Sequence, residues 1–254
     1  MHINFPVTVS VFGTPMLLHG IMETLGIFIA FRYYLWLKRK QGDTIDKHSR
    51  LVALTAAILG AVAGSHLLGA LEDVPRWIAY PGFWKYLYGN KTLVGGLVGG
   101  LILVELAKKW SGEKRPTGDL YTFPLLLGMI SGRIGCFSTG VYEETYGVPT
   151  SLPWAMNLGD GIPRHPVALY EILFLLLLRA ILSFVNRRYK LVPGALYKLF
   201  LMSYLLFRFM LDFIKPGWRY CLGLGSIQLT CLAGLIYYYR YILNPKLLLK
   251  TDAS

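Results

Sequence analysis

Residues 125–137 read LLLGMISGRIGCF, and residues 201–213 read LMSYLLFRFMLDF. Each stretch is apolar enough to form a membrane helix, yet each carries an arginine, Arg133 in the first and Arg208 in the second. An arginine at the centre of a bilayer costs roughly 2.5–3.5 kcal/mol on insertion scales unless an anion or water meets it. The two stretches therefore predict membrane helices around a polar cavity that receives a negatively charged ligand.

The composition also indicates a membrane protein. The chain has 254 residues, of which 54% are hydrophobic and 16% charged, and its mean hydropathy is +0.47. Soluble domains are roughly 45–50% apolar. The net charge of +12 comes without a basic run interleaved with aromatic residues, so we expect no nucleic-acid partner. We expect one integral membrane domain, residues 1–254.

Apolar segments long enough to cross a bilayer, which takes about 20 residues, predict an all-α fold with about seven transmembrane helices. These segments are residues 13–37, 50–71, 92–110, 118–135, 166–186, 193–214 and 222–243. Six or eight spans are the alternatives. The N-terminal stretch lacks a basic region before its first apolar run, so we expect no cleavable signal peptide.

The loops between these segments differ in their basic residues. One set of loops contains Lys38, Arg39, Lys40, Lys47, Arg50, Lys108, Lys109, Lys114, Arg115, Arg187, Arg188, Lys190, Arg240, Lys246 and Lys250. The opposite set contains the smaller group Arg76, Lys85, Lys91, Arg164, Lys215 and Arg219. By the positive-inside rule the larger group faces the cytoplasm. This predicts an N-terminus outside and a C-terminus in the cytoplasm.

Two segments on the predicted outer side are long enough to have a role of their own. Residues 72–91 are rich in proline and aromatic residues, and we expect them to form an arm on the lipid surface. Residues 138–165 form a loop rich in glycine, proline and tyrosine, and loops of this length are often functional. The cysteines Cys136, Cys221 and Cys231 lie in apolar segments without disulfide or metal-ligand spacing. We therefore expect buried free thiols, no metal and no cofactor.

Ionisable residues in or beside the predicted spans lie at one depth, toward the outer face. They are His19, Glu23, His66, Lys91, Arg133, Arg164, His165, Glu171, Arg208 and Asp212. Taken singly, each has a simpler interpretation. His19 with Glu23 and Arg208 with Asp212 are ion pairs of i,i+4 helix spacing, while His66 is a hydrogen-bonded core residue. In the same way Lys91 snorkels to the interface, and Glu143 and Glu144 belong to a solvated loop. The four glycines Gly95, Gly96, Gly99 and Gly100 indicate close helix packing. The shared depth favours a functional site.

The chemistry of this set suits an anionic phospholipid. Two guanidinium groups, those of Arg133 and Arg208, can bind a phosphate with paired hydrogen bonds at any physiological pH. His19 and His66 can transfer protons near neutral pH. We therefore expect an enzyme that moves a lipid group from an anionic phospholipid.

Three ordered motifs resemble those of the prolipoprotein diacylglyceryl transferase family, over roughly residues 13–243. Residues 132–137, GRIGCF, followed by Gly140 and by Tyr146 and Gly147, are similar to the family's GRxGNF signature. Residues 164–171, RHPVALYE, are similar to RHPxQLYE, and residues 208–213, RFMLDF, are similar to RFxxEF.

The resemblance implies a seven-helix transferase of the bacterial cytoplasmic (inner) membrane, with its site open to the bilayer and the outer face. Such enzymes move the diacylglyceryl group of phosphatidylglycerol to the lipobox cysteine thiol of a prolipoprotein and release glycerol phosphate. The catalytic residues then expected are Arg133, Arg208, His66, His19 and Glu171. The substrate-binding residues then expected are Arg164, His165, Lys91, Glu23, Glu143, Glu144, Tyr146, Gly147 and Asp212.

The chain departs from the family pattern where the base is expected. Val94 stands where the family has the histidine of a His-Gly-Gly motif that is proposed as the base. Cys136 and Thr139 replace frequent asparagines, and Ala168 replaces the motif glutamine.

Two explanations of the missing histidine are open. In the first, His66, His19 or Lys91 supplies the base. In the second, the chain is a paralogue that serves another outer-face acceptor, a sugar or a lipid. A non-catalytic lipid binder or transporter is the remaining alternative, although the sequence shows no internal repeat of the kind that transporters often have.

Overall fold

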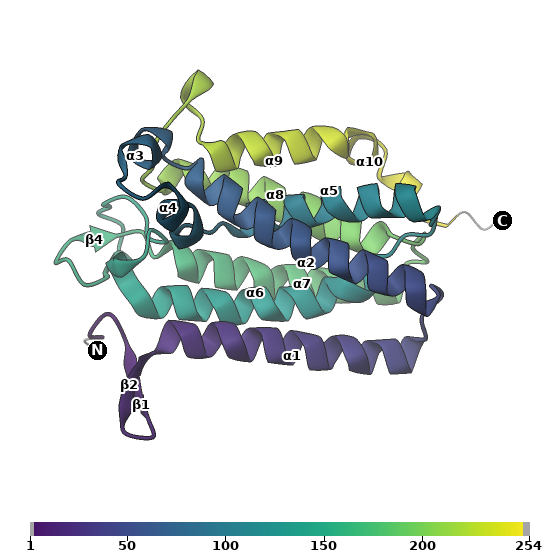
Figure 1. Ribbon diagram of the computed structural model, residues 1–254, viewed down its shortest axis with the longest axis horizontal. Coiled ribbons are helices and arrows are strands. Elements are labelled where there is room, and N and C mark those ends of the chain that lie inside the picture. Colours follow the sequence, from purple (N-terminus) through teal and green to yellow (C-terminus); the bar gives the residue numbers. More distant parts are fainter. Residues whose placement is uncertain (1–2, 251–254) are drawn as a thin grey trace. The chain divides into compact units, whose positions relative to one another are not determined.

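The chain folds mainly into α-helices, with two short β-hairpins in its loops (Figure 1). The structure is a computed structural model and describes residues 3–250, apart from the side chain of Cys221. The chain divides into two compact units. The first unit comprises Met1–Gly42, Leu120–Tyr189 and Phe213–Pro216, and the second comprises Asp43–Asp119, Lys190–Asp212 and Gly217–Ser254.

The first unit contains three long helices. They are α1 (Leu18–Gln41), α6 (Asp119–Thr139) and α7 (Val167–Arg188). Its shorter elements are β1 (Thr8–Val11), β2 (Thr14–Leu17), η1 (Gly140–Tyr142), β3 (Met156–Asn157) and β4 (Pro163–Arg164). Strands β1 and β2 pair antiparallel, as do β3 and β4.

Small residues bring α1 and α6 close together. A Cβ atom on Gly26 of α1 would lie 2.9 Å from the Cβ of Ser131 on α6. The hydroxyl of Ser131 donates a hydrogen bond of 2.7 Å to the carbonyl oxygen of Met22. Farther along the pair, the rings of Tyr34 and Tyr121 stack with centroids 4.9 Å apart. These contacts fix the start of α1 beside the end of α6.

The second unit is built from the remaining helices. They are α2 (Lys47–Ala70), α3 (Val74–Ala79), α4 (Phe83–Gly89), α5 (Leu93–Ser111), α8 (Ala195–Leu211), η3 (Cys221–Gly223), α9 (Ser226–Tyr237), α10 (Tyr239–Leu243) and η4 (Pro245–Leu248). The short helix η2 (Asp212–Ile214) begins in the second unit and ends in the first.

Glycines form the contact between α2 and α5. A Cβ atom on Gly64 would lie 2.3 Å from the carbonyl oxygen of Gly95, and one on Gly99 would lie 2.4 Å from that of Gly60. Any side chain at these positions would force the helices apart. The predicted packing role is confirmed for Gly95 and Gly99. Gly96 and Gly100 have more room, with nearest atoms at 3.6 and 3.3 Å.

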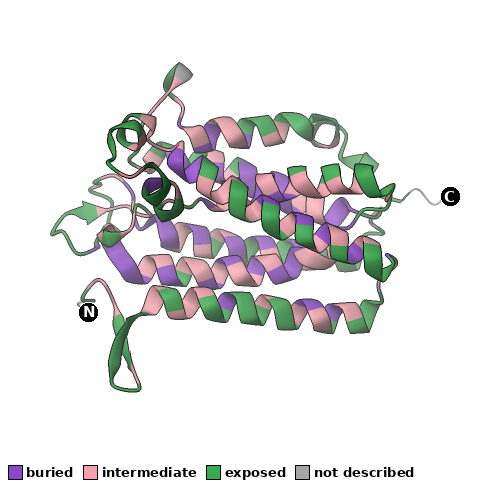
Figure 2. Ribbon diagram, viewed as in Figure 1, coloured by how far each residue is buried: buried purple, intermediate pink, exposed green. Residues whose placement is uncertain are grey.

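Within the described residues, three helices are long and apolar enough to cross a membrane: α2, α6 extended to Tyr142, and α7. The helices α4 and α5 pass the same test together but are bent by 94°, as in a broken span or a re-entrant loop. Large apolar side chains such as Leu173, Leu177 and Phe184 of α7 are exposed. Figure 2 shows exposed positions along the long helices. Soluble proteins avoid extended apolar surfaces of this kind. The predicted membrane character is confirmed.

Each of the seven segments predicted to cross the membrane contains a helix, but several boundaries differ by three to five residues, and the starts of the first and last helices are among them. The first segment was expected from residue 13, whereas α1 begins at Leu18 because Phe12 and Gly13 form the turn of the β1–β2 hairpin. Both residues have positive φ, 50° and 79°, as the turn of a two-residue hairpin requires. The last segment was expected from residue 222, whereas α9 begins at Ser226. The number of spans and the orientation of the termini stay predictions.

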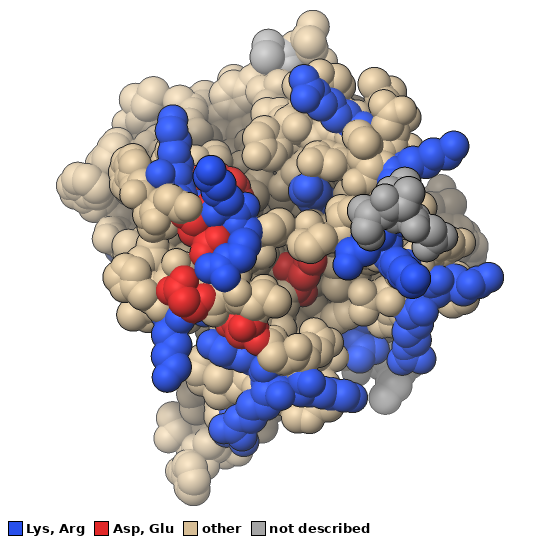
Figure 3. Space-filling view, turned by 90° about the vertical axis from the view of Figure 1, so that its right-hand side faces the viewer, with Lys and Arg blue, Asp and Glu red and all other residues tan. Residues whose placement is uncertain are grey.

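Basic residues collect at helix ends. In the first unit, α1 ends with Lys38, Arg39 and Lys40, and α7 ends with Arg187 and Arg188. Figure 3 shows one face of the molecule on which Lys and Arg side chains are prominent. Cations at the last turn of a helix interact favourably with its dipole, so these positions serve helix stability as well as the predicted orientation.

Candidate functional site

The first unit buries an ion pair between two predicted catalytic residues. Nε of Arg133 on α6 lies 2.8 Å from Oε1 of Glu171 on α7. The side chain of Glu171 is 1% exposed and that of Arg133 is 13% exposed. A buried carboxylate needs a cationic partner, and Arg133 supplies it. The geometry therefore places the Glu171 carboxylate directly against the guanidinium of Arg133.

A second cluster surrounds His19 at the start of α1. Nε2 of His19 lies 3.2 Å from Oε1 of Glu23, one helical turn along. Nδ1 lies 3.0 Å from Oε2 of Glu143, which follows η1. The hydroxyl of Thr139 lies 3.3 Å from the same oxygen of Glu143. The loop glutamate against His19 is therefore Glu143, which the sequence alone did not distinguish from Glu144.

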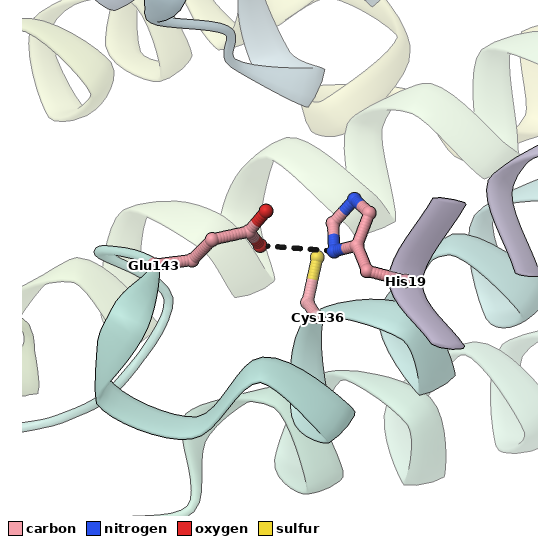
Figure 4. A group of neighbouring side chains, drawn as sticks. All are labelled: His19, Cys136 and Glu143. Atoms are coloured by element: carbon pink, nitrogen blue, oxygen red, sulfur yellow. Dashed lines mark ion pairs between the residues drawn. The ribbon is translucent and has the colours of Figure 1, made fainter. Parts of the chain in front are cut away.

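The cysteine of the GRIGCF motif lies beside both clusters. Nη1 of Arg133 is 3.6 Å from Sγ of Cys136. The ligand atoms of His19, Cys136 and Glu143 all lie within 4.8 Å of one another (Figure 4). Cys136 is half-buried and Cys231 is buried, and both are free cysteines; the side chain of Cys221 lies outside the described residues.

The outer loop packs the second motif against Tyr146 and Gly147. The guanidinium carbon of Arg164 lies 5.0 Å from the ring centroid of Tyr146. The backbone amide of Gly147 donates to the carbonyl oxygen of His165 over 3.1 Å. A Cβ atom on Gly147 would lie only 2.5 Å from the Cβ of His165. The two predicted groups are therefore brought together, and only glycine fits at position 147.

Further contacts fix Arg164 and His165. Nε of Arg164 donates to Oδ2 of Asp160 over 2.8 Å, and this hydrogen bond lowers the pKa of the Asp160 carboxyl. Nδ1 of His165 lies 3.1 Å from the hydroxyl of Tyr170, which also accepts a 2.8 Å hydrogen bond from Nε1 of Trp154. Asp160 was not among the predicted residues, although its i,i+4 spacing to Arg164 was a signal.

A hollow in the first unit joins the first two motifs. It is a small, partly open hollow with room for about one water molecule. Its walls include Cys136 and Phe137 of the first motif and Val167 and Ala168 of the second, with Tyr146 beside them. Two positions at which the chain departs from the family pattern, Cys136 and Ala168, therefore line one surface.

In the second unit, Arg208 and Asp212 are both buried, at 4% and 6% exposure. Nη2 of Arg208 lies 3.6 Å from Oδ1 of Asp212. Nη1 of Arg219 lies 3.3 Å from Oδ2 of the same aspartate and 2.8 Å from Oε1 of Gln228. Asp212 thus serves two arginines. The contacts of Arg219 and Gln228 were not predicted from the sequence. The available signal for Gln228 was its position as a single amide in an apolar segment.

His66 is a residue of α2, and its ring lies against the bend between α4 and α5 within the second unit. Its Nδ1 is 3.2 Å from the carbonyl oxygen of Leu87 and 3.2 Å from that of Asn90. Carbonyl oxygens only accept hydrogen bonds, so Nδ1 carries a proton. In the neutral ring the lone pair then lies on Nε2. Lys91, the next residue after Asn90, is exposed, and Val94 is 1% exposed on α5.

The structure therefore groups the predicted residues within each unit. The first unit holds His19, Glu23, Arg133, Glu143, Glu144, Tyr146, Gly147, Arg164, His165 and Glu171, and the second holds His66, Lys91, Arg208 and Asp212. A common depth for all of them stays a prediction.

These features define an α-helical membrane protein in which an arginine–carboxylate pair, Arg133 with Glu171, joins two helices of membrane-spanning length. A model of the family described as prolipoprotein diacylglyceryl transferase matches residues 6–243, and the chain belongs to this family of transferases.

Three curated relatives share the name phosphatidylglycerol–prolipoprotein diacylglyceryl transferase. The protein from Finegoldia magna is 28% identical over 257 residues, covering 97% of this chain and 98% of its own length. That from Nitratidesulfovibrio vulgaris is 33% identical over 221 residues, 83% of this chain and 80% of its own. That from Bordetella bronchiseptica is 36% identical over 216 residues, 79% of each.

Proposed function

We propose that this chain transfers the diacylglyceryl group of phosphatidylglycerol to the lipobox cysteine thiol of a prolipoprotein and releases glycerol phosphate. The observation that carries the proposal is Arg133, buried on a membrane-length helix and held by Glu171 in a chain of this family. The names of the relatives support the choice of both substrates.

The reaction makes charge on the phosphate. The acceptor thiolate forms a C–S bond with the glycerol carbon while the C–O bond to phosphate breaks. The phosphodiester carries one negative charge, and the phosphate monoester that leaves carries up to two. A fixed guanidinium stabilises the developing charge more strongly than the starting charge, and only this difference lowers the barrier. Arg133 suits this role because its partner Glu171 holds its position in advance.

Arg208 is the proposed second cation for the phosphate. Arg208 and Arg219 both approach Asp212, and guanidinium groups bind phosphate through paired hydrogen bonds. This network supports a role for Arg208 in holding the phospholipid headgroup.

His66 is the base that we propose in place of the missing histidine. Its Nδ1 faces two carbonyl oxygens, so its Nε2 is free of a proton in the neutral ring and can accept one. A thiol needs only modest help, because its pKa of about 8.5 leaves some thiolate at neutral pH. His19 is a poorer candidate, since both of its ring nitrogens already face carboxylates.

The finer topology belongs to the same proposal. We place seven spans in the bacterial cytoplasmic membrane, with the N-terminus and the site toward the outer face. The distribution of Lys and Arg supports this orientation. The proposed reaction requires it as well, because prolipoproteins present their lipobox on that side. The segment of residues 72–91 forms α3 and α4, which expose Ile78 at 80% and Trp84 at 68%, as an arm on a lipid surface would.

A second candidate function keeps the donor and changes the acceptor. It is favoured by Val94, an apolar residue 1% exposed where the family has its histidine. In this alternative the lipid-derived group goes to a sugar or to another lipid.

The test uses purified protein in micelles that contain phosphatidylglycerol, with a synthetic lipobox peptide and mass spectrometry. We expect the peptide to gain one diacylglyceryl group and glycerol phosphate to appear. Consumption of phosphatidylglycerol with an unmodified peptide would support the altered acceptor. If a mixed-phospholipid control is silent as well, a non-catalytic lipid binder or transporter is the better description.

A further inference from the structure

Three potential metal ligands converge in the first unit. His19 lies near the start of α1, Cys136 near the end of α6, and Glu143 in the loop after η1. Figure 4 shows the three side chains pointing toward one another from these separate segments. Their ligand atoms lie within 4.8 Å of one another, and Nδ1 of His19 is 3.0 Å from Oε2 of Glu143.

The helix packing is built to allow this approach. A Cβ atom on Gly135, next to Cys136, would lie 3.1 Å from the carbonyl oxygen of His19 and 3.2 Å from its Cα. Any larger residue at position 135 would therefore press against the backbone of α1. Gly135 and the contact between Gly26 and Ser131 together bring the histidine to the cysteine.

Each of the three ligands also has an outer partner. Nε2 of His19, the nitrogen on the far side of the ring, lies 3.2 Å from Glu23. Sγ of Cys136 lies 3.6 Å from Nη1 of Arg133, and Glu143 lies 3.3 Å from the hydroxyl of Thr139. A carboxylate on the second ring nitrogen is the usual support of a metal-bound histidine, and it fixes the ring orientation.

The donor set selects the kind of metal. Magnesium and calcium prefer oxygen ligands throughout. Imidazole nitrogen, thiolate sulfur and carboxylate oxygen together suit zinc, with bonds of about 2.0–2.3 Å. Sites with three protein ligands keep a fourth position for water or substrate, whereas structural zinc sites have four.

We propose that His19, Cys136 and Glu143 form a binding site for a zinc-class divalent ion, with one coordination position open to a substrate ligand. Tetrahedral geometry with such bonds places the donor atoms about 3.3–3.8 Å apart. The ligand atoms, which lie within 4.8 Å of one another, must therefore approach by up to about 1.5 Å. The side chain of Glu143 is 38% exposed and can make this adjustment.

The open position has a use that rests on the proposed function. The sulfur of the acceptor cysteine binds the ion, which makes the thiol a stronger acid, and the proposed base accepts its proton. The metal-bound thiolate then forms the C–S bond while the C–O bond of the phospholipid breaks, and the electron pair leaves with the phosphate. The site would thus prepare the acceptor in a chain that has Val94 where its family has a histidine.

Binding is measured directly on tag-free protein in detergent, stripped with a chelator and titrated with Co²⁺. Cobalt reports its ligands, because a thiolate bound to Co²⁺ gives sulfur-to-metal charge-transfer absorption in the near ultraviolet. We expect one Co²⁺ per chain with this absorption, and displacement by one equivalent of Zn²⁺. Titration without a charge-transfer band, or without saturation at one equivalent, overturns the site.

Matched variants assign the ligands. Cys136→Ala should abolish the charge-transfer band, whereas Cys231→Ala, at the other described free cysteine, should keep it. Glu143→Gln should weaken Co²⁺ binding, and Glu144→Gln beside it should not. Glu23→Gln, which removes only the outer partner of His19, should lower the affinity about 10- to 100-fold. Equal binding by the Cys136 and Glu143 variants and their controls contradicts the proposal even if one variant folds poorly.

The metal titration tests the site and the peptide assay tests the proposed function, so a negative result in one can be told from a negative result in the other. Diacylglyceryl transfer by protein that binds no Co²⁺ overturns the metal site and leaves the proposed function standing. One Co²⁺ bound through Cys136 without peptide modification supports the site and counts against the proposed acceptor. Transfer that a chelator stops and Zn²⁺ restores supports both.

Discussion

Nε of Arg133 lies 2.8 Å from Oε1 of Glu171, and this pair links α6 to α7 inside the first unit. The two residues belong to different motifs, GRIGCF and RHPVALYE, that are separated in the sequence by the whole outer loop. The arginine is therefore presented by one helix and oriented by another. In the proposed reaction its guanidinium would not have to be ordered when the phospholipid binds, and such preorganisation is a main source of electrostatic catalysis.

Substitutions in the Arg133–Glu171 pair should change stability and transfer activity to different extents. Arg133→Lys should lose most of the transfer activity, because a lysine cannot reproduce the planar, paired hydrogen bonds of a guanidinium. Glu171→Gln should lower the free energy of unfolding by about 3–5 kcal/mol, because it removes the carboxylate charge that pairs with Arg133. Its transfer activity should fall as well. The double variant Arg133→Met with Glu171→Leu should regain much of the stability but none of the activity. Melting in detergent and peptide transfer measure the two effects.

The control for this series is Arg187→Lys at the exposed end of α7, which should retain both activity and stability. Near-normal transfer by Arg133→Lys would remove the phosphate role from this arginine.

A different arginine pair should matter for folding alone. Nε and Nη2 of Arg50 lie 2.9 and 2.5 Å from the two carboxylate oxygens of Asp43, and Nη1 donates to the carbonyl oxygen of Thr117 over 2.9 Å. Both charged side chains are less than a tenth exposed. Arg50→Met should therefore destabilise the protein by about 3–5 kcal/mol.

The comparison for Arg50 is Arg115→Met. Arg115 forms ion pairs with Glu113, whose side chain is 6% exposed, and with Asp46, which is 55% exposed. Arg115 itself is about half exposed, so water screens its charge more than that of Arg50, and exposed pairs contribute little. Thermal melting should show a large drop for the first variant and a small one for the second. Equal drops would mean that burial is not what makes the Arg50 pair important.

Helical spacing explains which parts of the site could be predicted from the sequence. His19 with Glu23 and Arg208 with Asp212 are i,i+4 pairs, and a helix places such residues side by side whatever else it packs against. The apolar segments fixed the helices in the same way, because a bilayer leaves few other backbone structures.

Contacts between elements were the part that spacing could not supply. The pairing of Arg133 with Glu171 depends on how α6 packs on α7, and the contact of His19 with Glu143 depends on the path of the loop after η1. Arg219 reaches Asp212 from a segment without regular spacing to it. The β1–β2 hairpin was missed because its strands are four residues each and adjoin an apolar helix, so their pattern merged with that of α1.

His66 should act through one nitrogen only. In His66→Asn, the side-chain amide can still donate to the carbonyl oxygens of Leu87 and Asn90, but it has no basic atom in place of Nε2. We expect turnover to fall by about 10²- to 10⁴-fold, the range of general-base catalysis, with little change in phosphatidylglycerol binding. The acidic limb of the pH–rate profile should disappear as well, which loss of a structural contact would not cause.

The matched control for His66 is His48→Asn, near the start of the same helix α2 and exposed. Its turnover and pH profile should equal those of the unaltered protein. An unchanged pH profile in His66→Asn would assign the base to another residue.

Restoring the family histidine at position 94 should not restore the family's base. Val94 is 1% exposed on α5, and Gly95 beside it packs against Gly64 with no room for a side chain. A histidine is larger than valine and brings polar nitrogens into this packing, which typically costs 1–3 kcal/mol for the volume alone, as an order of magnitude. Val94→His should therefore melt at a lower temperature and show no gain in thiol transfer.

Val98→His, one turn along α5 and only half-buried, is the matched comparison and should melt closer to the parent protein. A Val94→His protein that kept its melting temperature and transferred diacylglyceryl faster would show that space for the family's histidine has been preserved, and His66 would then no longer be needed as the base.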